Sequence, residues 1–432
     1  MKRADVHRSI EAVWRIESAR LIARLARLTG GLAVAEELAQ DALVSALETW
    51  PKSGIPDKPG AWLMAAAKNR AIDHLRRRRL LAEKHQQLGH EIDLARAPDG
   101  PDTGPDLDDP MGDDLLRLIF IACHPVLSTD ARVALTLKLV CGLSSGEIAR
   151  AFLAAEPTVA QRIVRAKRTL TEARVPFELP RGPELGARLA SVLEVIYLVF
   201  NEGYTATRGD DWVRPGLCDE ALRLGRILAE LAPNEPEVHG LVALMEIQSS
   251  RLRARTTSTG DPILLLDQDR SRWDPLLIQR GLAALERAEA IGGTLGPYAL
   301  QAAIASCHAR ARTAEQTDWS RIAALYDALA QVAPSPVVEL NRAVAVGMAF
   351  GPAAALEMVE ALHTEPRLQQ YHLLPSVRGD LLRKLGRHED ASEAFRQAAE
   401  LTGNERERRL LLRRAAQCAG ANDQRGRTKP NH

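Results

Sequence analysis

The stretch Trp62–Arg79, WLMAAAKNRAIDHLRRRR, is alanine-rich, contains no glycine or proline, and ends in four consecutive arginines. This composition predicts one continuous helix. At about 100° per residue, polar and aromatic side chains share one face of that helix, namely Trp62, Asn69, Asp73 and Arg76, flanked by Arg70 and Arg77. The opposite face is apolar and contains Met64, Ala67, Ala71, Ile72 and Leu75. We expect the apolar face to be anchored in a core and the polar face to meet a partner.

The chemistry of the polar face suits nucleic acid. Arginines bind phosphates, an aromatic ring stacks on a base, and an asparagine amide hydrogen-bonds a base edge. The alternative interpretation is a solvated helix end whose arginines interact favourably with the helix dipole.

Length and composition favour a multidomain helical protein. A chain of 432 residues exceeds one ordinary core. A 46% hydrophobic and 26% charged composition is typical of a soluble globular protein, and 4% aromatics with abundant Ala, Leu and Arg favour helices. No apolar run approaches the ~20 residues of a membrane span. The N-terminus is charged throughout and lacks the apolar core of a signal peptide, so we expect a cytoplasmic protein without membrane contact.

The formal net charge of +1 conceals an uneven distribution along the chain. Residues 1–90 carry 16 basic and 10 acidic side chains, whereas residues 91–114 carry 1 and 9. Residues 115–180 carry 9 basic and 5 acidic side chains, and the remainder is nearly neutral. Two basic modules joined by an acidic strip are typical of a nucleic-acid-binding half, and the neutral half suits protein interaction.

The acidic strip is expected to be a linker. Residues 97–114 contain four prolines, three glycines and seven aspartates, a composition that cannot bury a core. We assign the linker to residues 91–114, between domains at 1–90 and 115–178.

A second motif lies in residues 142–168. Ser144 and Glu147 have capping-box spacing at the start of one short helix, and Pro157 suits the first turn of the next. In the second helix Val159, Ile163, Ala166 and Leu170 form an apolar face. The opposite face is polar and free of acids, and consists of Thr158, Gln161, Arg162, Arg165 and Arg168. This pattern predicts a helix-turn-helix, the alternative being a helical hairpin with a charged outer face.

Residues 186–416 form a helical region with loose internal repetition. Pro297 and Pro334 are 37 positions apart, and Gly351 and Gly386 are 35 apart. Spacings near the ~34 residues of a tetratricopeptide (TPR) predict stacked helical pairs. An insertion around 251–275 breaks the period, and residues 417–432 are expected to be a disordered tail.

Five scattered cysteines without C-x-x-C spacing favour buried thiols over disulfides or a zinc site. We expect neither a metal nor a cofactor.

With both motifs in view, residues 20–79 and 113–172 resemble regions 2 and 4 of bacterial RNA polymerase sigma factors of the sigma-70 family, extracytoplasmic-function (ECF) group. The segments that carry the resemblance are EELAQDALVSALETW, AWLMAAAKNRAIDHLRRR, LVCGLSSGEIARAF and TVAQRIVRAKRTL. The later segments YLVFNEGY and LLLDQDRSRWD are similar to the subgroup with a long TPR-like C-terminal extension. The implied fold is all-α, with two small helical sigma domains joined by the acidic linker and followed by a TPR-like repeat domain.

The resemblance implies three binding surfaces on this chain. The surface for core RNA polymerase, its β′ and β subunits, corresponds to Glu36, Glu37, Gln40 and Asp41; the alternative there is an ordinary acidic helix start. The −10 promoter surface corresponds to Trp62, Lys68, Asn69, Arg70, Asp73, Arg76 and Arg77, with Asn69 beside the pocket for a flipped-out base. The −35 surface, docked in the major groove, corresponds to Thr158, Gln161, Arg162, Arg165 and Arg168.

On this interpretation the protein binds core polymerase and promoter DNA, helps to melt the promoter and does no chemistry. The aspartates of the linker suggest an RNA mimic in the polymerase channel. The C-terminal domain is expected to regulate the sigma domains in cis or to bind a protein partner. Its contact candidates are Asn201, Glu202, Tyr204, Asp267, Asp269, Arg270, Arg272 and Trp273, unless these residues only cap helices and form salt bridges between repeats.

Two other classes of function stay open at this point. A helix-turn-helix regulator with a TPR-like sensor needs no polymerase, but it leaves residues 20–79 unexplained. An enzyme would have to recruit Glu202, Tyr204 and Asp267, yet no nucleophile–base pair, phosphate loop or metal spacing is present.

Overall fold

A computed structural model describes residues 3–88, 111–152, 154–180, 182–207 and 209–427. Every regular element within these ranges is a helix, which confirms the predicted all-α class. The chain divides into two compact units, residues 1–195 and 196–432. None of the helices in these ranges has the length and apolarity that a membrane span requires.

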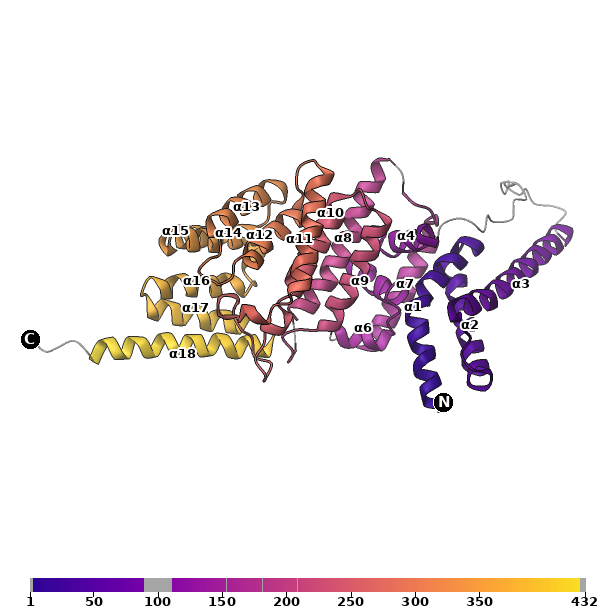
Figure 1. Ribbon diagram of the computed structural model, residues 1–432, viewed down its shortest axis with the longest axis horizontal. Helices are drawn as coiled ribbons and strands as arrows, with labels where there is room; N and C mark the ends of the chain where they lie inside the picture. Colours follow the sequence, from indigo (N-terminus) through magenta and orange to yellow (C-terminus); the bar gives the residue numbers. More distant parts are fainter. Residues whose placement is uncertain (1–2, 89–110, 153, 181, 208, 428–432) are drawn as a thin grey trace, which may run out of the picture. The chain divides into compact units, whose positions relative to one another are not determined.

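The first unit is built from the helices that Figure 1 draws in indigo to magenta. They are α1 (Arg3–Thr29), α2 (Leu32–Ser53), α3 (Pro59–Leu88), α4 (Met111–Ala122), α5 (Thr129–Leu139), α6 (Ser145–Ala151), α7 (Glu156–Glu172) and the first half of α8 (Pro183–Tyr204).

Helices α1, α2 and α3 contact one another around a common core that includes Leu25, Trp50 and Leu63. Helices α1 and α2 are separated at Gly30, whose φ of 69° favours glycine. On α3 the buried stripe follows i, i+4 spacing from Leu63 through Ala67 to Ala71. Ile72 is 39% exposed, so its predicted place on the apolar face is wrong: only the narrow stripe facing α1 and α2 is covered.

Helices α4 to α7 form a second helical cluster in this unit, and α4 also packs on α1. Because α4 begins at Met111, the predicted linker at 91–114 extends too far. Asp114 is 1% exposed and belongs to the folded helix, where it pairs with arginines. The rest of the predicted linker, residues 91–110, lies outside the described residues.

The second unit continues from α8 through helices that pack largely on their neighbours along the chain, as in helical-repeat proteins. They are α9 (Pro215–Leu231), α10 (Pro236–Ser249), α11 (Pro275–Ile291), α12 (Pro297–Arg310), α13 (Trp319–Val332), α14 (Pro336–Ala349), α15 (Pro352–Ala361), α16 (Leu373–Lys384), α17 (His388–Leu401) and α18 (Glu405–Arg427). Short 3₁₀ turns at Leu252–Ala254, Leu265–Asp267 and Arg270–Arg272 occupy the predicted insertion between α10 and α11.

The end of the chain departs from its prediction. Helix α18 continues to Arg427, so the disordered tail expected from 417 is wrong as far as that residue. Leu411, Ala415 and Cys418 are buried in the core that α18 shares with α17, and this packing extends the helix. All five cysteines are buried and free, as predicted.

Candidate nucleic-acid and polymerase interface

Helices α6 and α7 form the predicted helix-turn-helix, and its capping box is complete. The Ser144 hydroxyl accepts a hydrogen bond from the Glu147 backbone N–H at 3.1 Å, and the Glu147 carboxylate accepts one from the Ser144 N–H at 2.7 Å. Burial opposes ionisation of Glu147, but these bonds and the nearby Arg15 guanidinium outweigh it and lower the pKa of the carboxyl. Pro157 lies in the first turn of α7, as its spacing predicted.

The two faces of α7 separate as the sequence predicts. Val159, Ile163, Ala166 and Leu170 are all buried. On the opposite side Thr158, Gln161, Arg165 and Arg168 are exposed, and Arg162 is half-buried. An amphipathic helix held by one face therefore presents amide, hydroxyl and guanidinium groups to solvent, the groups that read base edges and bind phosphates in a major groove.

Carboxylates from outside the predicted face contact two of its arginines. Arg162 pairs with Asp130 of α5 at 3.1 Å, and Arg168 pairs with Glu172, one turn later on α7, at 2.6 Å. Both pairs are largely solvent-exposed, so each contributes little to stability and is readily exchanged for a phosphate.

The polar face of α3 is also largely open. Asn69, Asp73, Arg76 and Arg77 are exposed. The half-buried Trp62 packs edge-to-face on Trp50 of α2, with ring centroids 5.4 Å apart, so the α2 core positions its ring. Lys68 is half-buried.

Arg70 connects the surfaces predicted on α3 and α2. Its guanidinium donates to the Ser45 hydroxyl at 2.8 Å and lies 4.0 Å from the Asp41 carboxylate. Glu37, Gln40 and Asp41 are exposed on α2, so the structure brings the two predicted surfaces side by side.

Comparison with known families identifies both helical clusters. The model of Sigma-70 region 2 matches residues 16–80, and the model of Sigma-70, region 4 matches residues 117–170. Both helical clusters are therefore similar to regions of sigma-70 proteins. Residues 188–289 match a further family model, described as a family of unknown function (DUF6596).

Two relatives of this chain differ in how much of it they cover. An uncharacterized protein of Rhizobium meliloti (strain 1021) is 45% identical over 386 residues, which cover 88% of this chain and 89% of the relative. The probable ECF RNA polymerase sigma factor SigI of Mycobacterium tuberculosis is 29% identical over 171 residues, covering 39% of this chain and 57% of that protein. No solved structure matches.

Region 4 covers one of the residues predicted to bind polymerase. Glu36 of α2 is only 8% exposed and forms an ion pair with Lys167 of α7. Glu36 is therefore less accessible than a residue that binds polymerase needs to be, because Lys167 pairs with it. Lys167 lies between the two faces of α7 and was not among the predicted site residues. Its position within a basic helix was the only feature of the sequence that pointed to a contact.

Two further ion-pair groups join regions 2 and 4. The buried Asp114 carboxylate lies 3.5 Å from Arg24 and 3.4 Å from Arg27 of α1, and 2.7 Å from Arg117. Arg15 of α1 pairs with Glu147 at 2.8 Å.

The regulatory contact candidates of the second unit divide into three groups. Asp269 caps a 3₁₀ turn and Glu202 pairs with Arg214, as the structural alternative predicted. Asn201, Tyr204, Arg270 and Trp273 lie inward around Arg251, and Trp273 is only 5% exposed. Asp267 and Arg272 are exposed.

Proposed function

We propose that this protein is an RNA polymerase sigma factor of the ECF group. The observation that carries the proposal is helix α7, whose apolar face is buried and whose Gln161 and Arg165 side chains are exposed for a −35 element. A helix-turn-helix alone also suits an independent regulator. The additional match to Sigma-70 region 2 favours the polymerase subunit.

In this proposal region 2 has two partners. Glu37, Gln40 and Asp41 bind the core enzyme, while Asn69 and the arginines of α3 bind the −10 element. Unstacking a base costs a few kcal/mol, which contacts in a base pocket must offset for the promoter to melt. The protein thus works by binding rather than by catalysis, and it acts in the cytoplasm. The C-terminal helices form a TPR-like domain that regulates the sigma domains in cis.

The test combines the purified full-length protein with core RNA polymerase and a genomic promoter library, followed by mapping of transcript starts. We expect new starts and a stable complex with the core enzyme. No new starts and no complex would reject the sigma proposal, and DNA binding without a complex would favour the independent regulator.

Promoter recognition by α7 is then tested with Arg165→Ala. Loss of a guanidinium that contacts DNA should lower promoter affinity about tenfold and leave core affinity unchanged. The matched control is Arg367→Ala, which removes an equal charge from an exposed position in the second unit. Equal effects of the two substitutions would contradict a specific role for α7.

A further inference from the structure

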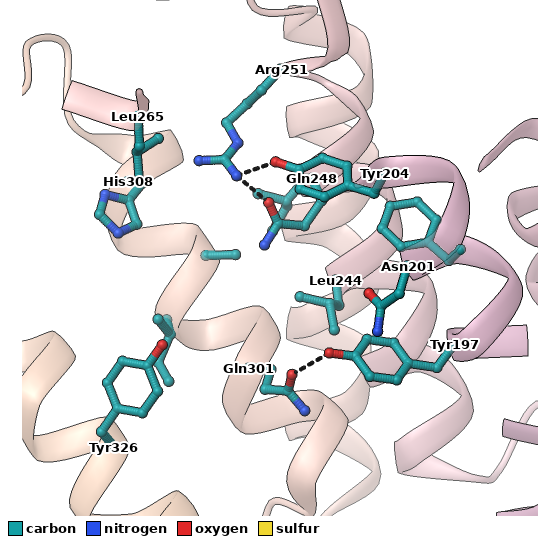
Figure 2. Close-up of a pocket in the computed structure, with 14 residues that line it drawn as sticks. Tyr197, Asn201, Tyr204, Leu244, Gln248, Arg251, Leu265, Gln301, His308 and Tyr326 are labelled. Carbon is teal, nitrogen blue, oxygen red and sulfur yellow. Dashed lines mark hydrogen bonds between the residues drawn. The ribbon is translucent and has the colours of Figure 1, made fainter. Parts of the chain in front are cut away.

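The second unit contains a cavity of about 270 Å³ bounded by the end of α8 and by α10, α12 and α13. Figure 2 shows polar groups converging on it from all four helices. Its walls combine apolar side chains such as Phe200 and Ile304 with the phenol of Tyr326 and the amide of Gln301. No aspartate or glutamate lines this cavity among the described residues.

Arg251 is the one arginine among the described residues that line the cavity. It is 8% exposed, and its Nη2 donates hydrogen bonds to the Tyr204 hydroxyl and the Gln248 side chain (Figure 2). The guanidinium carbon lies 5.6 Å from the ring centroid of Trp273. Among the described residues no carboxylate pairs with Arg251, and its Nε has no hydrogen-bond partner.

Two more arginines surround the same aromatic residues without a carboxylate partner in the described parts of the chain. Arg255 lies 3.6 Å from the Tyr204 ring centroid, and Arg270 lies 4.9 Å from that of Trp273. Burial is the main cause that lowers the pKa of the Arg255 and Arg270 guanidiniums. The exposed Glu315 carboxylate raises the pKa of Arg270 and offsets part of this effect. Arg270 donates to the backbone carbonyls of His308 and Ala311. Buried charges are normally paired, and among the described residues no carboxylate balances the buried Arg251 and Arg255.

His308 supplies a second unsatisfied group in the cavity wall. It is 8% exposed, and its Nδ1 has no hydrogen-bond partner among the described residues. Burial, together with the charges of Arg251 and Arg270, lowers its pKa to about 4, so the imidazole is neutral at pH 7. A neutral imidazole still offers one donor and one acceptor.

We propose that this cavity binds a small organic acid, whose carboxylate pairs with Arg251 and whose remaining polar groups hydrogen-bond to His308 and Tyr326. One lining guanidinium suits a monoanion. The volume, just below the roughly 300 Å³ at which common ligand pockets begin, limits the ligand to a small molecule. The site lies wholly in the second unit, so its occupancy is measurable whether or not the protein initiates transcription.

The test is ligand-observed NMR on the full-length protein with three probes: 4-hydroxybenzoate, its uncharged amide 4-hydroxybenzamide, and inorganic phosphate. We expect the acid to bind and the amide to bind at least about tenfold more weakly, because a charge-assisted hydrogen bond is lost. Arg251→Gln should weaken the acid about tenfold or more. The control Arg253→Gln removes the same charge from an exposed position two residues away and should leave binding unchanged.

Circular dichroism establishes whether each variant folds. If Arg251→Gln does not fold, Ala305→Leu takes its place, because it fills the cavity and leaves the arginine intact. Acid binding that survives either folded variant, equal binding of acid and amide, or binding of phosphate alone would overturn the proposal.

Discussion

His308 is a buried residue of the second unit whose protonation is controlled by its surroundings. His308 lies edge-to-face against Trp319, with ring centroids 5.1 Å apart, and its imidazole is kept neutral by burial and by two arginines. The arginine charges that favour a bound anion therefore also oppose protonation of His308.

We predict that stability falls in acid because of His308. Its folded pKa of about 4 lies below the value of 6.5 for an unperturbed histidine, so between these values the unfolded chain binds a proton that the folded protein excludes. Stability present above pH 6.5 is lost as the pH falls toward 4, by an amount on the order of 3 kcal/mol. Urea unfolding at pH 7 and pH 4 measures the loss, and His308→Asn should reduce it. An unchanged pH dependence in this variant would contradict the prediction.

Close helix packing at a single glycine gives a second prediction. A Cβ on Gly240 of α10 would lie 2.6 Å from the Ala299 backbone nitrogen of α12. Gly240→Ala should therefore destabilise the protein by about 1–3 kcal/mol in thermal unfolding, as overpacked cores do.

The matched control is Gly186→Ala in α8, where nothing lies within 4 Å of the added Cβ. There the better helix propensity of alanine should stabilise by about 0.5–1 kcal/mol. Equal effects at the two glycines would show that packing does not distinguish them.

At the scale of the element, α7 serves two surfaces at once. Arg165 faces solvent, while Lys167 turns toward α2 and covers Glu36. If Glu36 also binds polymerase, as the resemblance to sigma factors implies, the ion pair with Lys167 competes with that contact.

We therefore predict that Lys167→Gln raises affinity for core polymerase in the absence of DNA about fivefold, equivalent to ~1 kcal/mol. The measurement is a core-binding titration. Arg168→Gln, on the exposed side of the same helix, should leave the affinity unchanged. An unaltered affinity of Lys167→Gln would show that the pair does not compete with polymerase.

At the scale of the whole molecule, the boundary between the two units falls within α8, at Val195. The predicted domains ended at 178 and resumed at 186, but the first half of α8 belongs to the first unit. Arg132 of α5 donates to the Ser191 hydroxyl and pairs with Glu194 at 2.9 Å, and Val192 is fully buried.

A chain ending at Pro180 should consequently melt several degrees below one ending at Val195, because it exposes the core under α8 and leaves Arg132 without two partners. Differential scanning calorimetry of the two truncated chains provides the comparison, and Ser191→Ala in the longer chain measures the combined loss of the hydrogen bonds with Arg132 and with the Cys123 carbonyl. Equal melting temperatures would place the boundary before α8.

Local patterns predicted much of the fold. The capping box at Ser144 and the apolar face of α7 both follow from interactions between residues a few positions apart. The extents of α4 and α18 were not predictable in this way, because distant partners stabilise them: Asp114 pairs with α1, and Cys418 lies in the core shared with α17. Proline, glycine and aspartate counts carry no information about such partners.

By itself, the sequence determined the helical class, the helix-turn-helix and the polar faces of α3 and α7, because periodicity and capping are local properties of a helix. Only the tertiary structure decided that Lys167 covers Glu36 and that Tyr204, Arg251, His308 and Tyr326 line one cavity. Those residues come from separate helices and turns, and their proximity depends on the packing of the intervening chain. The physical reason is that a charged side chain interacts with the groups that folding places close to it. The spacing of residues along the chain does not reveal which groups these are.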